Sequence, residues 1–188
     1  MTSDTGTHRP VRKPRVKKGL IVVNTGEGKG KTTAALGVLF RAWGRNMRVE
    51  VFQFIKHTGS QFGESRAAAK LNIPWSALGD GFTWLSKDMD ATEELARRQW
   101  ENCQRAIMSG NHDVIVLDEF TYPLHYGWIP VHDVIEFLKQ KPEMLHVIIT
   151  GRYAPEELIE LADLVTEMKL IKHPYREQGI RAQPGLEF

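Results

Sequence analysis

Short apolar runs alternate along the chain with longer segments that repeat apolar residues every three or four positions. Runs with the length and branched side chains of buried strands occupy residues 19–25, 49–56, 113–119, 146–151 and 164–172. Segments with helical periodicity occupy residues 31–44, 64–71, 92–110, 131–141 and 154–162. Strands and helices in this order predict an α/β fold with a mostly parallel sheet and helices on both faces.

The length and composition fit one soluble globular domain. The chain has 188 residues, of which 41% are apolar and 26% charged, and a domain of this size buries enough surface to fold without disulfides. Its apolar runs are far shorter than the roughly 20 residues of a membrane helix. Cys103 is the only cysteine, which excludes an internal disulfide, and no apolar signal-peptide core follows Met1. We therefore expect a cytoplasmic protein without a membrane partner.

Charge is unevenly distributed between the first 18 residues and the rest. Residues 1–18 carry six basic residues against Asp4, a net charge of +5, so the remainder of this +2 chain carries −3. An acidic body does not favour a nucleic-acid partner, because domains that bind phosphate backbones concentrate Lys and Arg on the folded surface. We expect residues 1–18 to be a basic, flexible arm and residues 19–188 to form the domain. A nucleic-acid contact and a lid over an anionic ligand are the alternatives for the arm.

The sequence TGEGKGKTT at residues 25–33 lies between the first predicted strand and the first predicted helix. It resembles the Walker A loop, G-x-x-x-x-G-K-[ST], through Gly30, Lys31 and Thr32, although Thr25 replaces the first glycine. The glycines let backbone N–H groups turn toward phosphate oxygens, and the helix N-terminus adds positive potential. Lys31 would neutralise phosphate charge, and the Thr32 hydroxyl would ligate Mg²⁺. The loop alone does not decide whether the nucleotide is hydrolysed, donates its γ-phosphoryl group or is itself the substrate.

Two carboxylates, Asp118 and Glu119, end the strand predicted at residues 113–119. The carboxyl ends of parallel strands face the ligand crevice, so both side chains should point toward the phosphates that the loop binds. We expect one of them to complete the Mg²⁺ site with Thr32. Solvated acids at a strand end are the alternative interpretation.

Further motifs separate this chain from other P-loop proteins. They are VFQFIK at residues 51–56, GDGFTW at 79–84, LDEFTY at 117–122, IITGR at 148–152 and the C-terminal KHPYREQGIRAQPGLEF. In this order after the loop, they resemble the P-loop ATP:corrinoid adenosyltransferases, also called cob(I)alamin or cob(I)yrinic acid a,c-diamide adenosyltransferases. The resemblance covers about residues 19–188. It implies a RecA-like P-loop NTPase architecture, a homodimer, and a reaction in which Co(I) of a corrinoid attacks C5′ of ATP and displaces triphosphate.

The resemblance also implies roles for individual residues. The nucleotide-binding loop would comprise Gly26, Glu27, Gly28, Lys29, Gly30, Lys31, Thr32 and Thr33, with Lys31 as the catalytic group on the phosphates. The family frequently has Asn where this chain has Glu27, so no side-chain contact is carried over to that position. Arg41 matches an arginine that approaches the phosphates, although a surface role is the alternative. Glu119 matches the metal-binding carboxylate, with Asp118 beside it, and the ion would be Mg²⁺ or Mn²⁺.

Phe82 and Trp84 match an aromatic pair that the family places beneath the corrin ring. Cobalt in the +2 state holds an axial ligand whose lone pair opposes the entry of another electron. Apolar rings that displace this ligand would ease reduction to Co(I), which makes both residues candidate catalytic residues. A packing anchor for the loop is the alternative role for the two rings.

Two other functions are compatible with parts of the sequence. A P-loop kinase for a small molecule or nucleoside would share the loop and the carboxylates but would release ADP. A nucleotide-gated assembly protein would need a basic groove, which the −3 body does not favour. The sequence leaves open whether the corrinoid is cobalamin, cobinamide or an a,c-diamide precursor. A flavoprotein reductant is implied by the family resemblance alone.

Overall fold

The described part of the chain folds around one six-stranded sheet. The computed structural model describes residues 16–56, 62–79 and 89–187. Its strands are β1 (Ile21–Thr25), β2 (Val49–Phe54), β3 (Trp75–Leu78), β4 (Val114–Asp118), β5 (His146–Thr150) and β6 (Leu164–Glu167). All neighbouring strands are parallel, and their order is β3-β2-β4-β5-β1-β6. The predicted α/β fold with a parallel sheet is confirmed.

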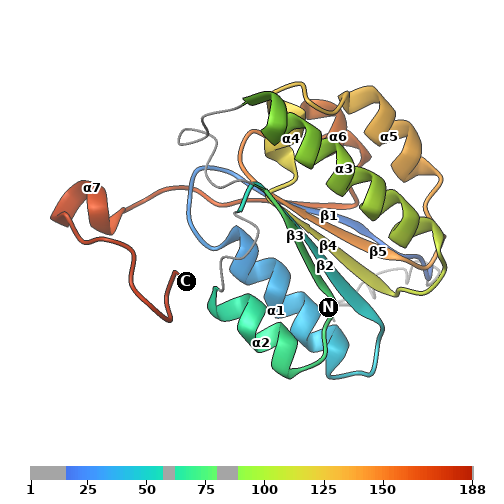
Figure 1. Ribbon diagram of the computed structural model, residues 1–188, viewed down its shortest axis with the longest axis horizontal. Helices are drawn as coiled ribbons and strands as arrows, with labels where there is room; N and C mark the ends of the chain where they lie inside the picture. The colour runs from blue at the N-terminus through green and yellow to red at the C-terminus, as the bar shows by residue number, and fades with distance from the viewer. Residues whose placement is uncertain (1–15, 57–61, 80–88, 188) are drawn as a thin grey trace, which may run out of the picture.

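Helices cover both faces of this sheet, as the alternating pattern predicts. They are α1 (Lys31–Trp43), α2 (Gly63–Lys70), α3 (Met89–Met108), α4 (Thr121–His125), α5 (Val131–Lys139), α6 (Glu156–Leu161) and α7 (Pro174–Gln178). Figure 1 shows α1 and α2 on one face, α3 to α6 on the other, and α7 projecting away from the body. Within the described ranges, no helix has both the length and the apolar character needed to cross a bilayer.

The central strand β4 anchors a separate apolar core on each face of the sheet. Val116 packs in an apolar cluster to which α1 contributes Leu39. The next residue, Leu117, points to the other face and packs in a second cluster, to which α3 contributes Trp100. All five residues of β4 are buried, as expected of a strand covered on both sides. Each fully buried aliphatic side chain of this kind stabilises the fold by about 1.5–3 kcal/mol. The last residue of this fixed strand is Asp118.

The structure contains three elements that the periodicity did not predict. They are β3, α4 and α7, each only four or five residues long, and such short segments hold too few residues for a period to emerge. The last strand is also shorter than expected, because β6 ends at Glu167 and the chain then turns toward the loop after β1. There the Met168 carbonyl accepts a hydrogen bond from the Gly28 N–H at 2.6 Å.

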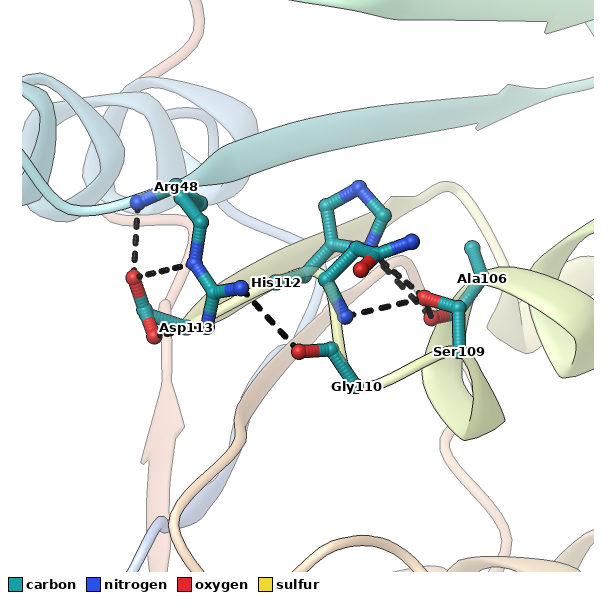
Figure 2. Close-up of polar contacts among 7 residues, drawn as sticks. Arg48, Ala106, Ser109, Gly110, His112 and Asp113 are labelled. Atoms are coloured by element: carbon teal, nitrogen blue, oxygen red, sulfur yellow. Dashed lines mark hydrogen bonds and ion pairs between the residues drawn. The ribbon is translucent and has the colours of Figure 1, made fainter.

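At the amino ends of the strands, Arg48 and Asp113 connect the starts of β2 and β4 (Figure 2). The Asp113 carboxylate accepts hydrogen bonds from the Arg48 backbone N–H and from Nη2, both at 2.8 Å. The Arg48 carbonyl accepts the Asp113 N–H at 2.8 Å, and Nη1 donates to the Gly110 carbonyl at 3.1 Å. The Arg48 side chain is the main cause that lowers the pKa of Asp113 to about 2. These bonds fix the register in which β2 and β4 enter the sheet.

We predict that Arg48→Met lowers the melting temperature at pH 7. The folded pKa of Asp113, about 2, lies below its ordinary value of 3.8. The contribution of the Arg48–Asp113 pair to the free energy of unfolding is therefore fully present above pH 3.8 and disappears as the pH falls toward 2. The difference from wild type should therefore shrink over this acidic window. Thermal unfolding followed by circular dichroism between pH 2 and 8 measures it. Arg45→Met, an exposed arginine in the turn after α1, is the matched control, and equal losses in both variants at pH 7 would contradict the prediction.

Candidate nucleotide-binding site

The loop between β1 and α1 has the strand–loop–helix form expected of a phosphate-binding loop. Gly26 and Gly30 adopt positive φ angles of 95° and 106°, which glycine tolerates without strain. A Cβ on Gly26 would lie 2.7 Å from the Met168 carbonyl oxygen, and one on Gly28 would lie 2.6 Å from the same atom. The loop is therefore held against the segment that follows β6, and only glycine fits at these two positions.

Lys31 begins α1 and turns its side chain back into the loop. Its Nζ donates hydrogen bonds to the carbonyls of Gly26 at 2.8 Å and Gly28 at 2.7 Å. Burial lowers the pKa of Lys31, while the nearby Glu119 carboxylate opposes this shift. The ammonium group thus lies inside the loop, with backbone carbonyls in place of water.

The Asp118 carboxylate at the end of β4 accepts hydrogen bonds from three side chains. Oδ1 accepts from the hydroxyls of Thr32 and Thr150, each at 2.7 Å, and Oδ2 accepts from Gln53 Nε2 at 2.8 Å. The ammonium of Lys56 lies 3.8 Å from Oδ2. Asp118 is fully buried, and both of its oxygens are engaged by protein donors. This geometry makes Asp118 a residue that orients Thr32.

Glu119 lies in a very different environment from its neighbour. Its backbone has a φ of 59°, in the left-handed region, and its Oε2 is buried without a hydrogen-bond partner among the described residues. Burial, followed by the charge of Asp118, raises the pKa of Glu119 to about 7. Lys56, Lys31 and Arg152 oppose this shift. A buried carboxylate oxygen that lacks a partner among these residues is available to a ligand.

Arg152 follows β5 and reaches the loop from the other side. Its Nη1 lies 3.0 Å from Glu27 Oε2. The Thr121 hydroxyl donates to the Arg152 carbonyl, and a Cβ on Gly151 would lie 2.1 Å from that hydroxyl oxygen. Gly151, with a φ of 139°, lets β5 leave the sheet closely packed on α4. Glu27 therefore has a partner in this chain, which the resemblance did not provide.

The other residues predicted for the site are placed differently. Thr33 is exposed in the first turn of α1, and Lys29 pairs with Glu187 near the C-terminus. Arg41 lies in the last turn of α1, ten residues after Lys31 and therefore about 15 Å away along the helix axis. The structure does not bring Arg41 together with the group around Lys31. Phe82 and Trp84 lie outside the described residues.

Sequence reasoning missed Gln53, Thr150, Arg152 and Lys56 as members of this site. A signal was present for two of them, because Gln53 and Thr150 are polar residues near the carboxyl ends of mostly apolar strands. A buried polar residue in such a run needs a partner, and near the carboxyl end of a parallel strand that partner belongs to the ligand crevice.

The oxygens present fit a hard divalent cation. The candidate ligands are the Thr32 hydroxyl and the Glu119 carboxylate. Within the residues that the structure describes, no group of three or more His, Cys, Asp or Glu side chains could hold a metal ion by itself. Mg²⁺ commonly uses one or two protein oxygens and completes its shell with water and phosphate oxygens. This donor set therefore suits a cation that arrives with a nucleotide.

The parallel sheet and this loop define a P-loop nucleotide-binding protein. A sequence model of the family described as ATP:corrinoid adenosyltransferase BtuR/CobO/CobP matches residues 17–188. A corrinoid adenosyltransferase of Sinorhizobium sp is 45% identical over 92% of this chain and 81% of its own length. The corrinoid adenosyltransferase of Escherichia coli K12 is 36% identical over 92% and 87%, and corrinoid adenosyltransferase CobA of Salmonella typhimurium is 36% identical over 95% and 90%. The chain belongs to the ATP:corrinoid adenosyltransferase family, and the resemblance seen in its motifs is confirmed.

We predict that Glu119→Gln changes how stability depends on pH when no metal is present. The folded pKa of Glu119, about 7, lies above its ordinary value of 4.5, so the folded state holds the proton more tightly than the unfolded state. The free energy of unfolding should therefore fall as the pH rises from about 4.5 to about 7. Gln cannot ionise, so this part of the decline should be absent and the melting temperature at pH 8 should exceed that of wild type.

Thermal unfolding in EDTA across pH 4 to 8 measures this difference. Glu160→Gln, which changes an exposed carboxylate on α6, is the control and should follow wild type. A decline in Glu119→Gln as steep as that of wild type would show that Glu119 does not carry the effect.

Proposed function

We propose that this chain transfers the 5′-deoxyadenosyl group of ATP to Co(I) of a corrinoid and releases triphosphate, in adenosylcobalamin biosynthesis and corrinoid salvage. The observation that carries the proposal is membership of the ATP:corrinoid adenosyltransferase family over residues 17–188. The phosphate-binding form of the loop supports it. The kinase alternative finds no support in the family or in the relatives named above.

In this reaction the electron pair of Co(I) forms the cobalt–carbon bond at C5′ of the ribose. The C5′–O5′ bond breaks, its electrons leave with the triphosphate, and the cobalt is formally oxidised from +1 to +3. No proton has to be removed from the nucleophile, so no side-chain base is needed. The protein's contribution is to hold the triphosphate, stabilise its growing charge and align C5′ with the cobalt.

Lys31 and the backbone N–H groups of residues 26–33 are the groups we assign to the triphosphate, apart from the Gly28 N–H, which donates to the Met168 carbonyl. Lys31 already lies inside the loop, bonded to the carbonyls of Gly26 and Gly28. Phosphate oxygens would replace these neutral acceptors with charged ones, which form stronger hydrogen bonds with an ammonium group. The stabilisation grows as negative charge develops on the leaving oxygen, so Lys31 acts on the transition state more than on bound ATP.

Thr32 and Glu119 are the residues we assign to Mg²⁺ or Mn²⁺, with Asp118 as the group that orients Thr32. The assignment rests on the unpaired Oε2 of Glu119 and on the Thr32 hydroxyl proton that Asp118 accepts at 2.7 Å. A bound divalent cation would offset the charge of the triphosphate. Arg152, which pairs with Glu27 beside the loop, is a further cation for the leaving group.

Other parts of the proposal rest on the family resemblance. They include a homodimer, a cytoplasmic location, a flavoprotein reductant, and placement of Phe82 and Trp84 beneath the corrin ring. Arg41 stays a predicted phosphate contact, although its position in the last turn of α1 leaves it far from Lys31 of the same chain. The arm at residues 1–18 stays a predicted flexible segment, with a role as a partial lid over the corrinoid. Lys18, at its end, pairs with Asp163 of the body.

The proposed reaction is tested with ATP, Mg²⁺ and chemically reduced corrinoid, by following the absorbance change of cobalt–carbon bond formation. We predict that Lys31→Ala lowers kcat/KM about a hundredfold, because loss of one such contact to the developing charge costs about 3 kcal/mol. Lys139→Ala, which removes an exposed lysine on α5 that pairs with Glu136, is the matched control and should keep the wild-type value. Near-wild-type kcat/KM for Lys31→Ala would exclude its assigned role.

A further prediction separates the two roles considered for Phe82 and Trp84. If the rings displace the axial ligand of Co(II), Ala at either position should impair adenosylation from Co(II) with a flavoprotein reductant. Corrinoid supplied as Co(I) bypasses that step, so activity should recover to a much larger fraction of wild type. Equal losses from both starting states, with a lower melting temperature, would instead support the packing role.

A further inference from the structure

The Thr150 hydroxyl connects the two acidic residues at the end of β4. Thr150 is the last residue of β5, the strand beside β4, and its side chain is fully buried. Its Oγ1 donates to Asp118 Oδ1 at 2.7 Å and accepts the Glu119 backbone N–H at 3.0 Å. A hydroxyl has one proton to donate, and here Asp118 receives it. One buried oxygen therefore fixes the side chain of Asp118 and the backbone of Glu119 together.

Gln53 holds the same carboxylate from the opposite side. It lies in β2, the other neighbour of β4, and its Nε2 donates to Asp118 Oδ2 at 2.8 Å. With Thr150 on Oδ1 and Gln53 on Oδ2, the carboxylate cannot rotate without breaking a buried hydrogen bond. Its fixed Oδ1 accepts the Thr32 proton at 2.7 Å, which directs the lone pairs of the Thr32 oxygen away from Asp118.

The hydrogen bond from the Glu119 N–H to Thr150 also constrains Glu119, the second candidate metal ligand after Thr32. Glu119 has a φ of 59°, and a side-chain-bearing residue holds this left-handed conformation only where its surroundings fix it. Thr150 is one such constraint, because it accepts the N–H of this residue directly. The direction in which the Glu119 side chain leaves the backbone therefore depends on a hydroxyl from a different strand.

We propose that Thr150 and Gln53 are positioning residues that align the Thr32 hydroxyl and the Glu119 carboxylate for the divalent cation of the bound nucleotide. Neither residue touches the substrate, and both act through Asp118, with Thr150 acting also through the Glu119 backbone. The inference rests on the proposed function, because it assumes a metal–ATP complex at the loop. It extends the site to the two strands that flank β4.

The test is the effect of Mg²⁺ on ATP affinity, which does not depend on turnover. Calorimetry gives the dissociation constant of ATP in EDTA and with Mg²⁺. The value in EDTA divided by the value with Mg²⁺ measures how much the metal strengthens ATP binding. Partners of metal ligands typically change metal affinity 10- to 100-fold when removed, so Thr150→Val should lower this ratio by at least about tenfold. Binding of ATP in EDTA should stay close to wild type.

Companion variants separate positioning from loss of stability. Thr150→Ser keeps the hydroxyl and should restore the ratio. Thr121→Val removes another buried hydroxyl, at the start of α4, that donates to the Arg152 carbonyl and not to Asp118. This variant should leave the ratio unchanged. If Thr150→Val does not fold, Gln53→Met carries the test and should lower the ratio in the same direction. Binding of Mn²⁺ to the ATP complex, followed by electron paramagnetic resonance, should weaken in parallel.

An unchanged ratio in Thr150→Val and Gln53→Met would overturn the inference. Equal losses in Thr150→Val and Thr121→Val would also overturn it, because loss of any buried hydroxyl in this region would then have the same effect. Lys31→Ala distinguishes these results from a failure of the proposed function. If Lys31→Ala keeps both the ATP affinity and the kcat/KM of wild type, the nucleotide site itself is wrong. If Lys31→Ala loses kcat/KM as predicted while Thr150→Val keeps the wild-type ratio, only the positioning roles are wrong.

Discussion

The buried carboxylate of Asp118 is the group on which the candidate site depends. A carboxylate without water is tolerated only where hydrogen-bond donors replace its hydration, and here the donors come from α1, β2 and β5. These elements are far apart in the sequence and are brought together by the strand order of the sheet. The bonds that make the burial of Asp118 tolerable also fix the start of α1 beside the end of β4. Folding and assembly of the loop are therefore coupled through one side chain.

The pair Asp118 and Glu119 shows how adjacent residues of the same charge acquire different roles. Asp118 is still in the strand, where its neighbours on both sides supply donors to each oxygen. Glu119 has left the strand in a left-handed conformation, and its Oε2 lacks a partner within the described residues. An unsatisfied buried carboxylate destabilises the fold, and sites of this kind are concentrated where a ligand supplies the missing partner. The structure thus separates an acid whose two oxygens are both hydrogen-bonded from one with an oxygen that lacks a partner among the described residues.

Much of this arrangement could be predicted from the sequence because its signals are local. Apolar runs identified five of the six strands, and the glycine–lysine run identified the loop. The positions of Asp118 and Glu119 followed from the rule that parallel strands deliver ligands at their carboxyl ends. The contacts of Thr150 and Gln53 could not be predicted, because they depend on which strands flank β4. The same holds for the pair between Arg152 and Glu27 and for the early end of β6 at the loop.

We propose that the loop holds ATP as a donor of its adenosyl group, with the triphosphate as leaving group. ATP that carries one label in adenine and another in the γ-phosphate, incubated with Mg²⁺ and a Co(I) corrinoid, tests this proposal. We expect the adenine label to enter the corrinoid while the γ label is recovered in an equal amount of intact triphosphate. Recovery of the adenine label in ADP, with the γ label in an acceptor or in orthophosphate, would contradict the claim.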